Sequence, residues 1–411
     1  MSNRWITLHP KAICKVKIPT SKSISNRLLV LQKIIGNSIQ ITNLSQADDT
    51  LILQEALNTS TGYINVKNAG TCFRFLTAYF ATTPGCTITL DGNERMRSRP
   101  VEPLVKALQM LGADIAYTNK SGFAPIKING KKLNGGSISI DSSISSQYVS
   151  ALLLSASNLN TELAVSLNGN TVSSTYIHMT IELMKQCGID IKTHNNTIFI
   201  QPQYSRENKS IICEADWSSA AFWFGFVAIS KTKELTIENL TLSGLQGDEN
   251  IVQFMKPLGV HTLQTQEGLL LNYVNNCNQE ALVFDMQNFP DLVPVLTVVA
   301  CANQRALTLN NVSHLQVKES NRLDVLCKEL KKCGFNIHHT TNSLQIIPNN
   351  TLQIKDSILL QSYEDHRMAM AFSLLSPLFS KIGITDAECV EKSYPTWWEE
   401  YEKAGATYNA D

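Results

Sequence analysis

The chain contains 411 residues, of which 43% are hydrophobic and 17% charged, with 35 basic and 35 acidic side chains. This length is typical of two or three domains. Because the charges balance, no overall charge attracts the chain to nucleic acid or to a membrane surface. Any anion must therefore be bound by a local cluster of cations.

The sequence contains no recognisable metal motif and no export signal. The ten cysteines include no CxxC pair and no His/Cys pair at zinc spacing, so we expect reduced, buried thiols. The first twenty residues lack the apolar segment of a signal peptide. The apolar run at 291–302 is shorter than the roughly 20 residues that span a bilayer, and it predicts a core helix. We expect a cytoplasmic protein that binds neither membrane nor nucleic acid.

Five amphipathic helices are predicted at regular intervals along the chain. Each is followed by a glycine and then by a short run that leads into a strand, as in KALQMLGADI at 106–115. A glycine directly after a helix supplies the left-handed residue that ends it. These glycines lie 71 to 76 residues apart, at Gly112, Gly188, Gly259, Gly334 and Gly405.

Six strongly apolar helices alternate with the amphipathic ones, and each follows a polar loop. The loops begin at Ser21, Asn68, Ser145, Asp216, Pro290 and Glu364. A helix that is apolar on all sides must be buried. The pattern therefore predicts six units of roughly 70 residues, with the apolar helices inside and the strands and amphipathic helices outside.

The polar loops are candidate anion sites, because the free N–H groups and the dipole at a helix N-terminus favour negative charge. A single Ser-rich loop is most simply an N-cap. Several of these loops also carry cations, which capping does not require. Examples are Lys22 and Arg27 in the first loop and Arg99 in the run ERMRSRP. Guanidinium groups suit bidentate binding of phosphate or carboxylate.

Two acids lie among these cations. Asp291 precedes a buried helix, and Glu319 lies between Lys318 and Arg322. Acids in such places most often neutralise their neighbours. A carboxylate inside a cationic pocket is also what an enzyme that moves protons on anionic substrates would need. The residues alone leave both readings open.

Five motifs resemble, in order, those of the EPSP synthase family. They are PTSKSISNR at 19–27, NAGTCFR at 68–74, ISSQY at 144–148, QVKESNR at 316–322 and YEDHRMAM at 363–370. The similarity extends from Lys22 to Lys392. It implies a two-domain inside-out α/β barrel, each domain having three βαβαββ units around buried parallel helices. One domain would comprise residues 1–19 and 214–411 and the other residues 20–213, with the active site in the cleft between them.

The resemblance also implies roles for individual residues. Phosphoenolpyruvate would be held by Lys22, Gly70, Arg99, Gln147, Arg322, Arg367 and Lys392. Shikimate 3-phosphate would be held by Lys22, Ser23, Arg27, Ser145, Ser146, Gln147, Ser173, Tyr176, Asp291 and Lys318. Asp291 would accept the proton of the attacking 5-hydroxyl. Glu319, helped by Lys22, would protonate the methylene carbon.

The implied reaction moves the enolpyruvyl group of phosphoenolpyruvate to the 5-hydroxyl of shikimate 3-phosphate by addition and elimination, in the pathway to chorismate and the aromatic amino acids. It needs no metal and no cofactor, and we expect a monomer. One alternative is the related transferase that acts on UDP-N-acetylglucosamine, but it uses a loop cysteine that ERMRSRP lacks. The other is an inactive anion-binding protein on the same scaffold, which would not need an acid at Asp291.

The sequence departs from the family pattern at five positions. Phe75 replaces a common proline, which we expect to reshape the start of its helix, and His314 replaces an asparagine that contacts the shikimate. The other departures are Thr20, Gln316 and Asn321. None of the five removes a charged catalytic group.

Overall fold

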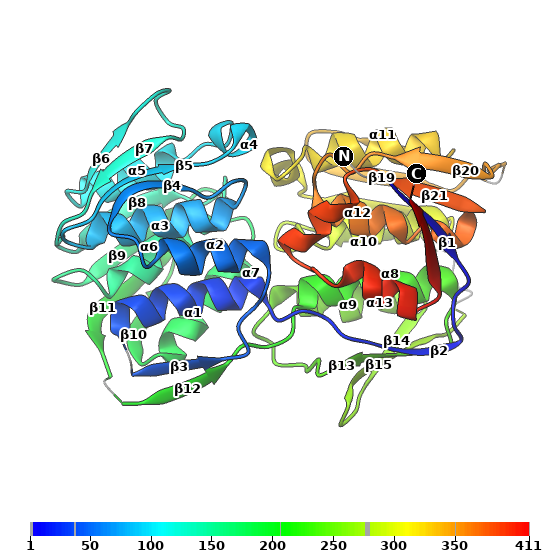
Figure 1. Cartoon of the computed structure of the whole chain (residues 1–411), viewed down its shortest axis with the longest axis horizontal. Coiled ribbons are helices and arrows are strands. Elements are labelled where there is room, and N and C mark those ends of the chain that lie inside the picture. The colour runs from blue at the N-terminus through cyan, green and yellow to red at the C-terminus, as the bar shows by residue number, and fades with distance from the viewer. Residues whose placement is uncertain (1–2, 37, 206, 276–279, 350, 411) are drawn as a thin grey trace. The chain divides into compact units, whose positions relative to one another are not determined.

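The computed structural model describes residues 3–36, 38–205, 207–275, 280–349 and 351–410 (Figure 1). The chain divides into two compact units. Unit 1 consists of Met1–Pro19 and Glu214–Asp411, and unit 2 consists of Thr20–Cys213. The chain thus passes from one unit to the other twice.

Unit 2 contains two complete βαβαββ repeats and one shorter one. The first is formed by β4 (Thr61–Asn65), α3 (Gly70–Thr82), β5 (Thr87–Asp91), α5 (Glu102–Met110), β6 (Asp114–Tyr117) and β7 (Ile126–Asn129). The second is formed by β8 (Gly136–Asp141), α6 (Ser146–Ala156), β9 (Leu163–Asn168), α7 (Ser174–Gln186), β10 (Ile189–His194) and β11 (Thr197–Tyr204). In each, two parallel strands flank the apolar helix and an antiparallel pair completes the sheet.

The shorter repeat of unit 2 differs from our expectation of three equal units. It contains α1 (Lys22–Ile35), β3 (Ile39–Thr42), α2 (Asp48–Ala56) and β12 (Lys209–Ile212). In the described residues, β3 pairs in parallel with β12 and forms a two-stranded sheet without the antiparallel pair. The chain continues from α2 directly to β4, so no residues remain to form those two strands.

Unit 1 contains three βαβαββ repeats, each with a four-stranded sheet. The one that is continuous in sequence contains β16 (Leu282–Asp285), α10 (Val293–Ala302), β17 (Leu307–Asn310), α11 (Arg322–Lys332), β18 (Asn336–His339) and β19 (Ser343–Ile347). The second contains β2 (Ile13–Val16), α8 (Trp217–Ser230), β13 (Glu234–Glu238), α9 (Ile251–Met255), β14 (Val260–Gln264) and β15 (Gly268–Tyr273). The third contains β20 (Ser357–Leu360), α12 (His366–Ser373), β21 (Lys381–Ile384), α13 (Trp397–Lys403), β22 (Ala406–Ala410) and β1 (Arg4–Leu8).

The N-terminal strands complete two of these sheets. β1 lies between β21 and β22, antiparallel to both. β2 pairs in parallel with β13. The first residues of the chain are therefore part of the unit formed by its second half, as the family resemblance implied.

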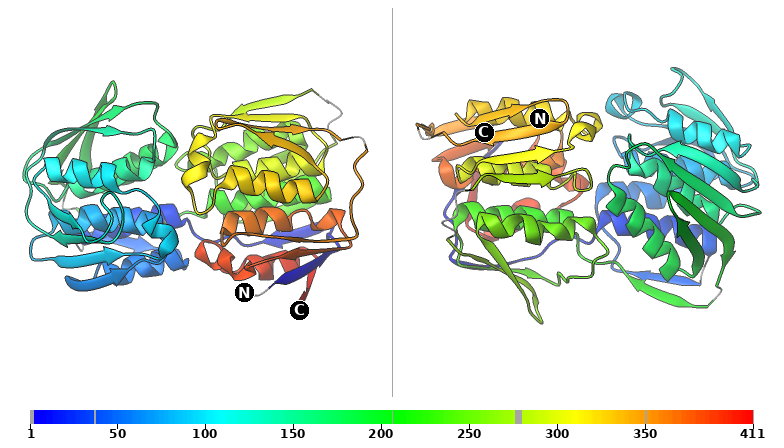
Figure 2. Two further views of the ribbon diagram at one scale, coloured as in Figure 1. Left: turned by 90° about the horizontal axis from the view of Figure 1, so that it is seen from above. Right: turned by 180° about the vertical axis from the view of Figure 1, so that it is seen from behind.

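The apolar helices lie inside each unit and the sheets lie outside (Figures 1 and 2). In α8 every residue from Trp217 to Ile229 is buried. Side chains at both ends show that neighbouring helices are parallel. The amide of Gln147 donates to Thr71 Oγ1 at the N-terminal ends of α6 and α3, 3.0 Å away, and Asn158 Nδ2 donates to the Thr82 carbonyl at their C-terminal ends.

The five predicted helix-ending glycines all adopt the expected left-handed backbone. Their φ angles lie between 87° and 115°. The predicted buried thiols are also confirmed for the described residues, because eight of the nine described cysteines are buried and the other is half-buried, all as free thiols. No helix in the described part of the chain is long and apolar enough to cross a membrane.

Candidate active site

Most of the predicted site residues lie at the N-terminal ends of the helices. Lys22, Gly70 and Ser146 are the first residues of α1, α3 and α6. In unit 1, Arg322 is the first residue of α11, and Asp291 lies two residues before α10. Because the buried helices of a unit run in the same direction, their N-terminal ends gather on one face. Each unit therefore has a polar half-site.

In unit 2, Lys22 is positioned by the cap of α1 and by an acid. Ser21 caps the helix by accepting the N–H of Ile24. The ammonium of Lys22 lies 3.0 Å from Asp49 Oδ2, and Asp49 is buried at the start of α2. The sequence reasoning did not identify Asp49 as part of the site. It orients the lysine and balances its charge.

Arg27 is a buried cation held by neutral groups. Its guanidinium donates to Thr180 Oγ1 at 2.7 Å and to the Ser23 carbonyl at 2.8 Å. It also donates to Ser150 Oγ and to the carbonyl of Tyr176. Burial lowers the pKa of Arg27 to about 10, which reflects the cost of desolvating a cation. An anionic ligand at this point would offset that cost.

Gly70 and Arg99 are in close contact. A Cβ atom on Gly70 would lie 2.6 Å from Arg99 Nη1 and 2.8 Å from Arg74 Nη1. Arg74 is fixed because it donates to the carbonyls of Gly70 and Pro100. The absence of a side chain at Gly70 is thus what allows two guanidinium groups to approach the start of α3. Gln147 lies beside them through its hydrogen bond to Thr71.

The serines expected to contact shikimate 3-phosphate have different local roles. Ser145 is the N-cap of α6 and accepts the N–H of Gln147. Ser146 follows it in the first turn. Ser173 precedes α7 with φ 54°, a left-handed conformation that is unusual for a residue with a side chain. Three residues later, the ring of Tyr176 faces the Arg27 guanidinium at 5.9 Å.

In unit 1, the half-site is organised around Arg322, whose side chain is 1% exposed. Its guanidinium bonds three carboxylates. They are Asp365 at 2.9 Å, Asp291 at 2.9 Å and Glu319 at 3.1 Å. Burial alone would lower the pKa of Arg322, but the charges of these acids outweigh it and raise the pKa well above the usual value.

The two candidate proton-transfer groups each contact a second cation. Asp291 Oδ1 lies 3.0 Å from Arg367 Nε, and Glu319 Oε1 lies 3.3 Å from Lys392 Nζ. Both carboxylates are half-buried, with 15% of the side chain exposed. The structure therefore brings together Asp291, Glu319, Arg322, Arg367 and Lys392, which are spread over a hundred residues of sequence.

Two acids of this half-site were missed by the sequence reasoning. Asp365 is the N-cap of α12, accepts the N–H of Arg367 and pairs with Arg322. Asp248 is buried and accepts a very short hydrogen bond from Ser218. Burial, and then the charge of Asp291, raise the pKa of Asp248 to about 7. The run YEDHRMAM contained a signal for Asp365, since an acid that precedes a helix is a typical cap.

The unusual residues are accommodated within the fold. Phe75 does not disrupt α3, which continues from Gly70 to Thr82, so our expectation of a reshaped helix start is not met. Its buried ring lies 5.4 Å from the Arg27 guanidinium. His314 is buried near Lys318, and burial followed by the Lys318 charge lowers its pKa to about 3, so its ring is neutral. Asn321 caps α11, and Gln316 donates to the carbonyl of Thr341.

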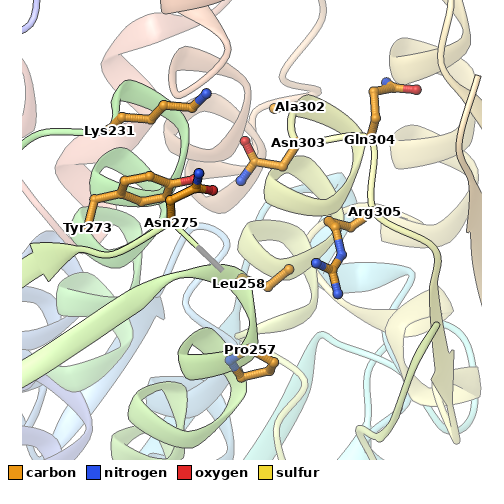
Figure 3. A pocket seen from close by; sticks show the side chains of 9 residues that line it. All are labelled: Lys231, Pro257, Leu258, Tyr273, Asn275, Ala302, Asn303, Gln304 and Arg305. Atoms are coloured by element: carbon orange, nitrogen blue, oxygen red, sulfur yellow. The ribbon is translucent and has the colours of Figure 1, made fainter. Parts of the chain in front are cut away.

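A separate pocket of about 300 Å³ lies at the other end of the helices in unit 1. It is lined by Lys231, Pro257, Leu258, Tyr273, Asn275, Ala302, Asn303, Gln304 and Arg305 (Figure 3). Lys231 and Asn303 are the C-caps of α8 and α10. Helix C-termini disfavour anions, and the amide of Asn303 is already bonded to the Ala228 carbonyl. This pocket is therefore distinct from the cationic half-sites.

Known proteins provide an independent comparison. The model of the family EPSP synthase (3-phosphoshikimate 1-carboxyvinyltransferase) matches residues 52–401. The chain belongs to the EPSP synthase family. A 3-phosphoshikimate 1-carboxyvinyltransferase of Bacteroides fragilis is 35% identical over 404 residues, which cover 98% of each chain. One of a Marinomonas species is 31% identical over 96% of this chain and 98% of its own.

The fold agrees with solved structures of EPSP synthase and a related enzyme. An EPSP synthase of Acinetobacter baumannii matches with a TM-score of 0.76 at 22% identity, covering 99% of this chain and all of that chain. The enolpyruvyl transferase NikO of Streptomyces tendae matches with a TM-score of 0.76 at 11% identity, covering 100% of this chain and 99% of that one. Both confirm the two-domain inside-out α/β fold predicted from the motifs.

Proposed function

We propose that this member of the EPSP synthase family uses the two half-sites together, with the substrates bound between them. The chain is an enolpyruvyl transferase of the shikimate pathway. It transfers the enolpyruvyl group of phosphoenolpyruvate to the 5-hydroxyl of shikimate 3-phosphate and releases phosphate. The observation that carries the assignment of roles is the cluster around Arg322. Two acids with the roles of proton acceptor and donor share one buried guanidinium and each have a second cation.

In the first step, the 5-hydroxyl oxygen attacks C2 of phosphoenolpyruvate and loses its proton to Asp291. Arg322 and Arg367 favour the ionised form of this carboxylate, which is the form that a proton acceptor requires. Glu319, helped by Lys22, delivers a proton to the methylene carbon. Because Arg322 and Lys392 favour the ionised form of Glu319, the proton comes from the ammonium of Lys22. The product of this step is a tetrahedral adduct that carries a methyl group and the phosphate.

In the second step, the C–O bond to phosphate breaks, with its electron pair leaving on the phosphate, and the methyl group returns a proton to Glu319, which forms the enol ether product. The cations assigned to phosphoenolpyruvate stabilise the negative charge that develops on the leaving phosphate. In unit 2 they are Lys22 and Arg99, and in unit 1 they are Arg322, Arg367 and Lys392. Arg27 and the serines at the starts of α6 and α7 hold shikimate 3-phosphate, together with Lys318 and Gln147.

Replacement of Asp291 tests this assignment. Asp291→Asn preserves the shape but removes the proton acceptor, so turnover in a phosphate-release assay should fall by about 10²–10⁴-fold. Binding of shikimate 3-phosphate, measured by calorimetry, should weaken much less. Asp285→Asn, which changes an exposed acid at the end of β16, is the matched control and should retain full activity. Near-native turnover of Asp291→Asn would exclude Asp291 from proton transfer.

Two further proposals concern the state of the protein. We expect a cytoplasmic monomer, because the basic and acidic side chains balance and no overall charge favours binding to a surface. Light scattering coupled to size exclusion should then give a mass near 45.6 kDa.

The inactive alternative predicts substrate binding without phosphate release. The UDP-N-acetylglucosamine alternative predicts turnover with that acceptor instead of shikimate 3-phosphate.

A further inference from the structure

A buried hydroxyl in unit 1 joins two parts of the chain that the reaction uses. Tyr394 lies two residues after Lys392 and is completely buried. Its hydroxyl donates a very short hydrogen bond to the carbonyl of Lys17. Lys17 belongs to the segment in which the chain leaves β2 and passes to unit 2, and it precedes Lys22 by five residues. Lys392 ends a short 3-10 helix (Ala387–Lys392), and we call residues 392–396, which connect it to α13, the Lys392 loop. One side-chain oxygen thus connects the Lys392 loop to the segment that leads to Lys22.

The orientation of this hydroxyl is fixed. It accepts a hydrogen bond from Trp223 Nε1 at 3.1 Å, so its own proton is directed to Lys17. The Tyr394 ring packs on Trp397 with a centroid distance of 5.5 Å. Burial raises the pKa of Tyr394 well above the usual value, so the group remains a neutral donor across the working pH range.

The chain passes between the units at residues 17–20 and 213–216, and further hydrogen bonds hold these two passing segments to unit 1. The N–H of Lys17 donates to Glu400 Oε2 at 2.9 Å, and Glu400 belongs to α13. The carbonyl of Pro19 accepts the N–H of Asp216 at 2.9 Å, which ties the two passing segments together. Asp216 is also the N-cap of α8. Up to Pro19 and from Asp216 onward, the backbone is therefore anchored in unit 1.

We propose that Tyr394 is a positioning residue, whose hydroxyl holds the Lys392 loop in register with the segment that leads to Lys22. This inference rests on the proposed roles of both lysines in binding phosphoenolpyruvate. Loss of the hydroxyl removes one anchor of the Lys392 loop, while the backbone bonds of Ser393 and Tyr394 to the Val390 carbonyl remain, so the ammonium of Lys392 is less often in place. The effect should appear mainly in the binding of phosphoenolpyruvate.

The chain offers a matched control in the same aromatic cluster. Tyr401 is also completely buried, stacks on Trp397 at 5.2 Å and has two hydrogen-bond partners. Its hydroxyl bonds Ser376 and the carbonyl of Ser373. Neither partner belongs to the Lys392 loop or to the passing segments. Tyr401→Phe therefore removes a comparable pair of bonds without touching the proposed connection.

The experiment compares steady-state kinetics of the full chain. Tyr394→Phe should raise the KM for phosphoenolpyruvate about tenfold, the scale of coupling between residues that share a network, with the KM for shikimate 3-phosphate within about twofold. Tyr401→Phe should leave both constants within about twofold. Thermal melting should show similar losses of stability for the two variants. Equal kinetic changes in the two would overturn the proposal.

A double-mutant cycle tests whether the effect passes through Lys392. In a Lys392→Ala background, Tyr394→Phe should change the KM for phosphoenolpyruvate by no more than about twofold. A full tenfold effect in that background would overturn the proposal. Lys392→Ala alone reports on the proposed function, because an unchanged KM would remove Lys392 from the site. If Tyr394→Phe does not fold, Trp223→Phe is the second variant. It removes the Nε1 donor that orients the Tyr394 hydroxyl, so it should raise the KM for phosphoenolpyruvate by a smaller factor. An unchanged KM would again overturn the proposal.

Discussion

Arg322 shows how single residues organise the half-site of unit 1. Its buried guanidinium bonds three carboxylates and fixes the position of two of them, Asp291 and Glu319. Breaking a buried pair by removing one partner is strongly destabilising, because an uncompensated charge remains. Arg322 is therefore a structural residue of unit 1 as well as a proposed ligand of phosphoenolpyruvate. The sequence identified it as a binding cation only.

Gly70 permits a quantitative prediction at the scale of one methyl group. In Gly70→Ala, the new Cβ would lie 2.6 Å from Arg99 Nη1, so the guanidinium must move. Gly70 is the first residue of α3 and does not have a positive φ angle, so alanine can adopt the same backbone conformation. An added methylene in a packed site costs about 1–3 kcal/mol. We expect the KM for phosphoenolpyruvate to rise about tenfold or more, with the melting temperature little changed.

The same experiment distinguishes a local effect from a general one. The KM for shikimate 3-phosphate serves as the internal control and should change less than that for phosphoenolpyruvate. A fall in melting temperature with both constants altered equally would show that the methyl group disturbs α3 and not Arg99 alone.

Asp248 should give unit 1 a measurable pH dependence. Burial, and then the charge of Asp291, raise the pKa of Asp248 in the folded state to about 7. In the unfolded state an aspartate has a pKa of about 3.9. Between these values the folded chain holds one more proton than the unfolded chain. The contribution of Asp248 to the free energy of unfolding is therefore fully present below about pH 4. This contribution decreases as the pH rises and is lost above about pH 7.

Asp248→Asn removes this titration and can still accept a hydrogen bond from Ser218. Relative to wild type, the variant should gain stability as the pH rises from 4.5 to 7.5, by an amount on the order of a few kcal/mol. Denaturant unfolding at several pH values measures the difference. Asp285→Asn, at an exposed position, should show no such trend. A parallel pH dependence for wild type and Asp248→Asn would contradict the shift.

At the scale of elements, the parallel packing of the buried helices creates each half-site. Gln147 bonds Thr71 at the N-terminal ends of α6 and α3, and Asn158 joins their C-terminal ends. In unit 1, Asn303 joins the C-terminal ends of α10 and α8 in the same way. Helix dipoles that point in one direction reinforce one another at a common face. This explains why the loops with cations and serines all lead into buried helices.

The contact between α1 and α3 gives a prediction for Phe75. Its ring lies 5.4 Å from the Arg27 guanidinium, and a desolvated cation–π contact contributes up to about 2 kcal/mol. Phe75→Leu should raise the KM for shikimate 3-phosphate by about 3- to 30-fold and leave that for phosphoenolpyruvate nearly unchanged. Phe80→Leu, at a buried position near the other end of α3, is the control for lost packing. Equal effects of the two would remove Phe75 from the Arg27 site.

For the whole molecule, the proposed cleft predicts closure on ligand binding. Lys22, Arg27 and Arg99 belong to unit 2, and Arg322 and Lys392 belong to unit 1. Bringing these cations together without anions costs like-charge repulsion, and substrate anions reverse its sign. Small-angle scattering should show a smaller radius of gyration with shikimate 3-phosphate, and a further decrease with an added phosphoenolpyruvate analogue. An unchanged radius of gyration would reject the closure.

The sequence alone determined the elements and the kind of chemistry, because both depend on near neighbours in the chain. Apolar runs behind polar loops predicted the six buried helices, and five glycines marked helix ends. The long motifs identified the family. The short repeat around α1 was not foreseen, although the polar loops at Ser21 and Asn68 lie only 47 residues apart and the later loops lie 71 to 77 apart.

Only the tertiary structure decided which groups meet. Asp49 pairs with Lys22 across 27 residues, Asp365 pairs with Arg322 across 43, and the hydroxyl of Tyr394 reaches Lys17 across 377. No local pattern marks such partners, because any buried acid or tyrosine could pair with many groups. Tertiary packing brings these residues within hydrogen-bond distance, and a hydrogen bond between desolvated groups is stronger than the same bond in water.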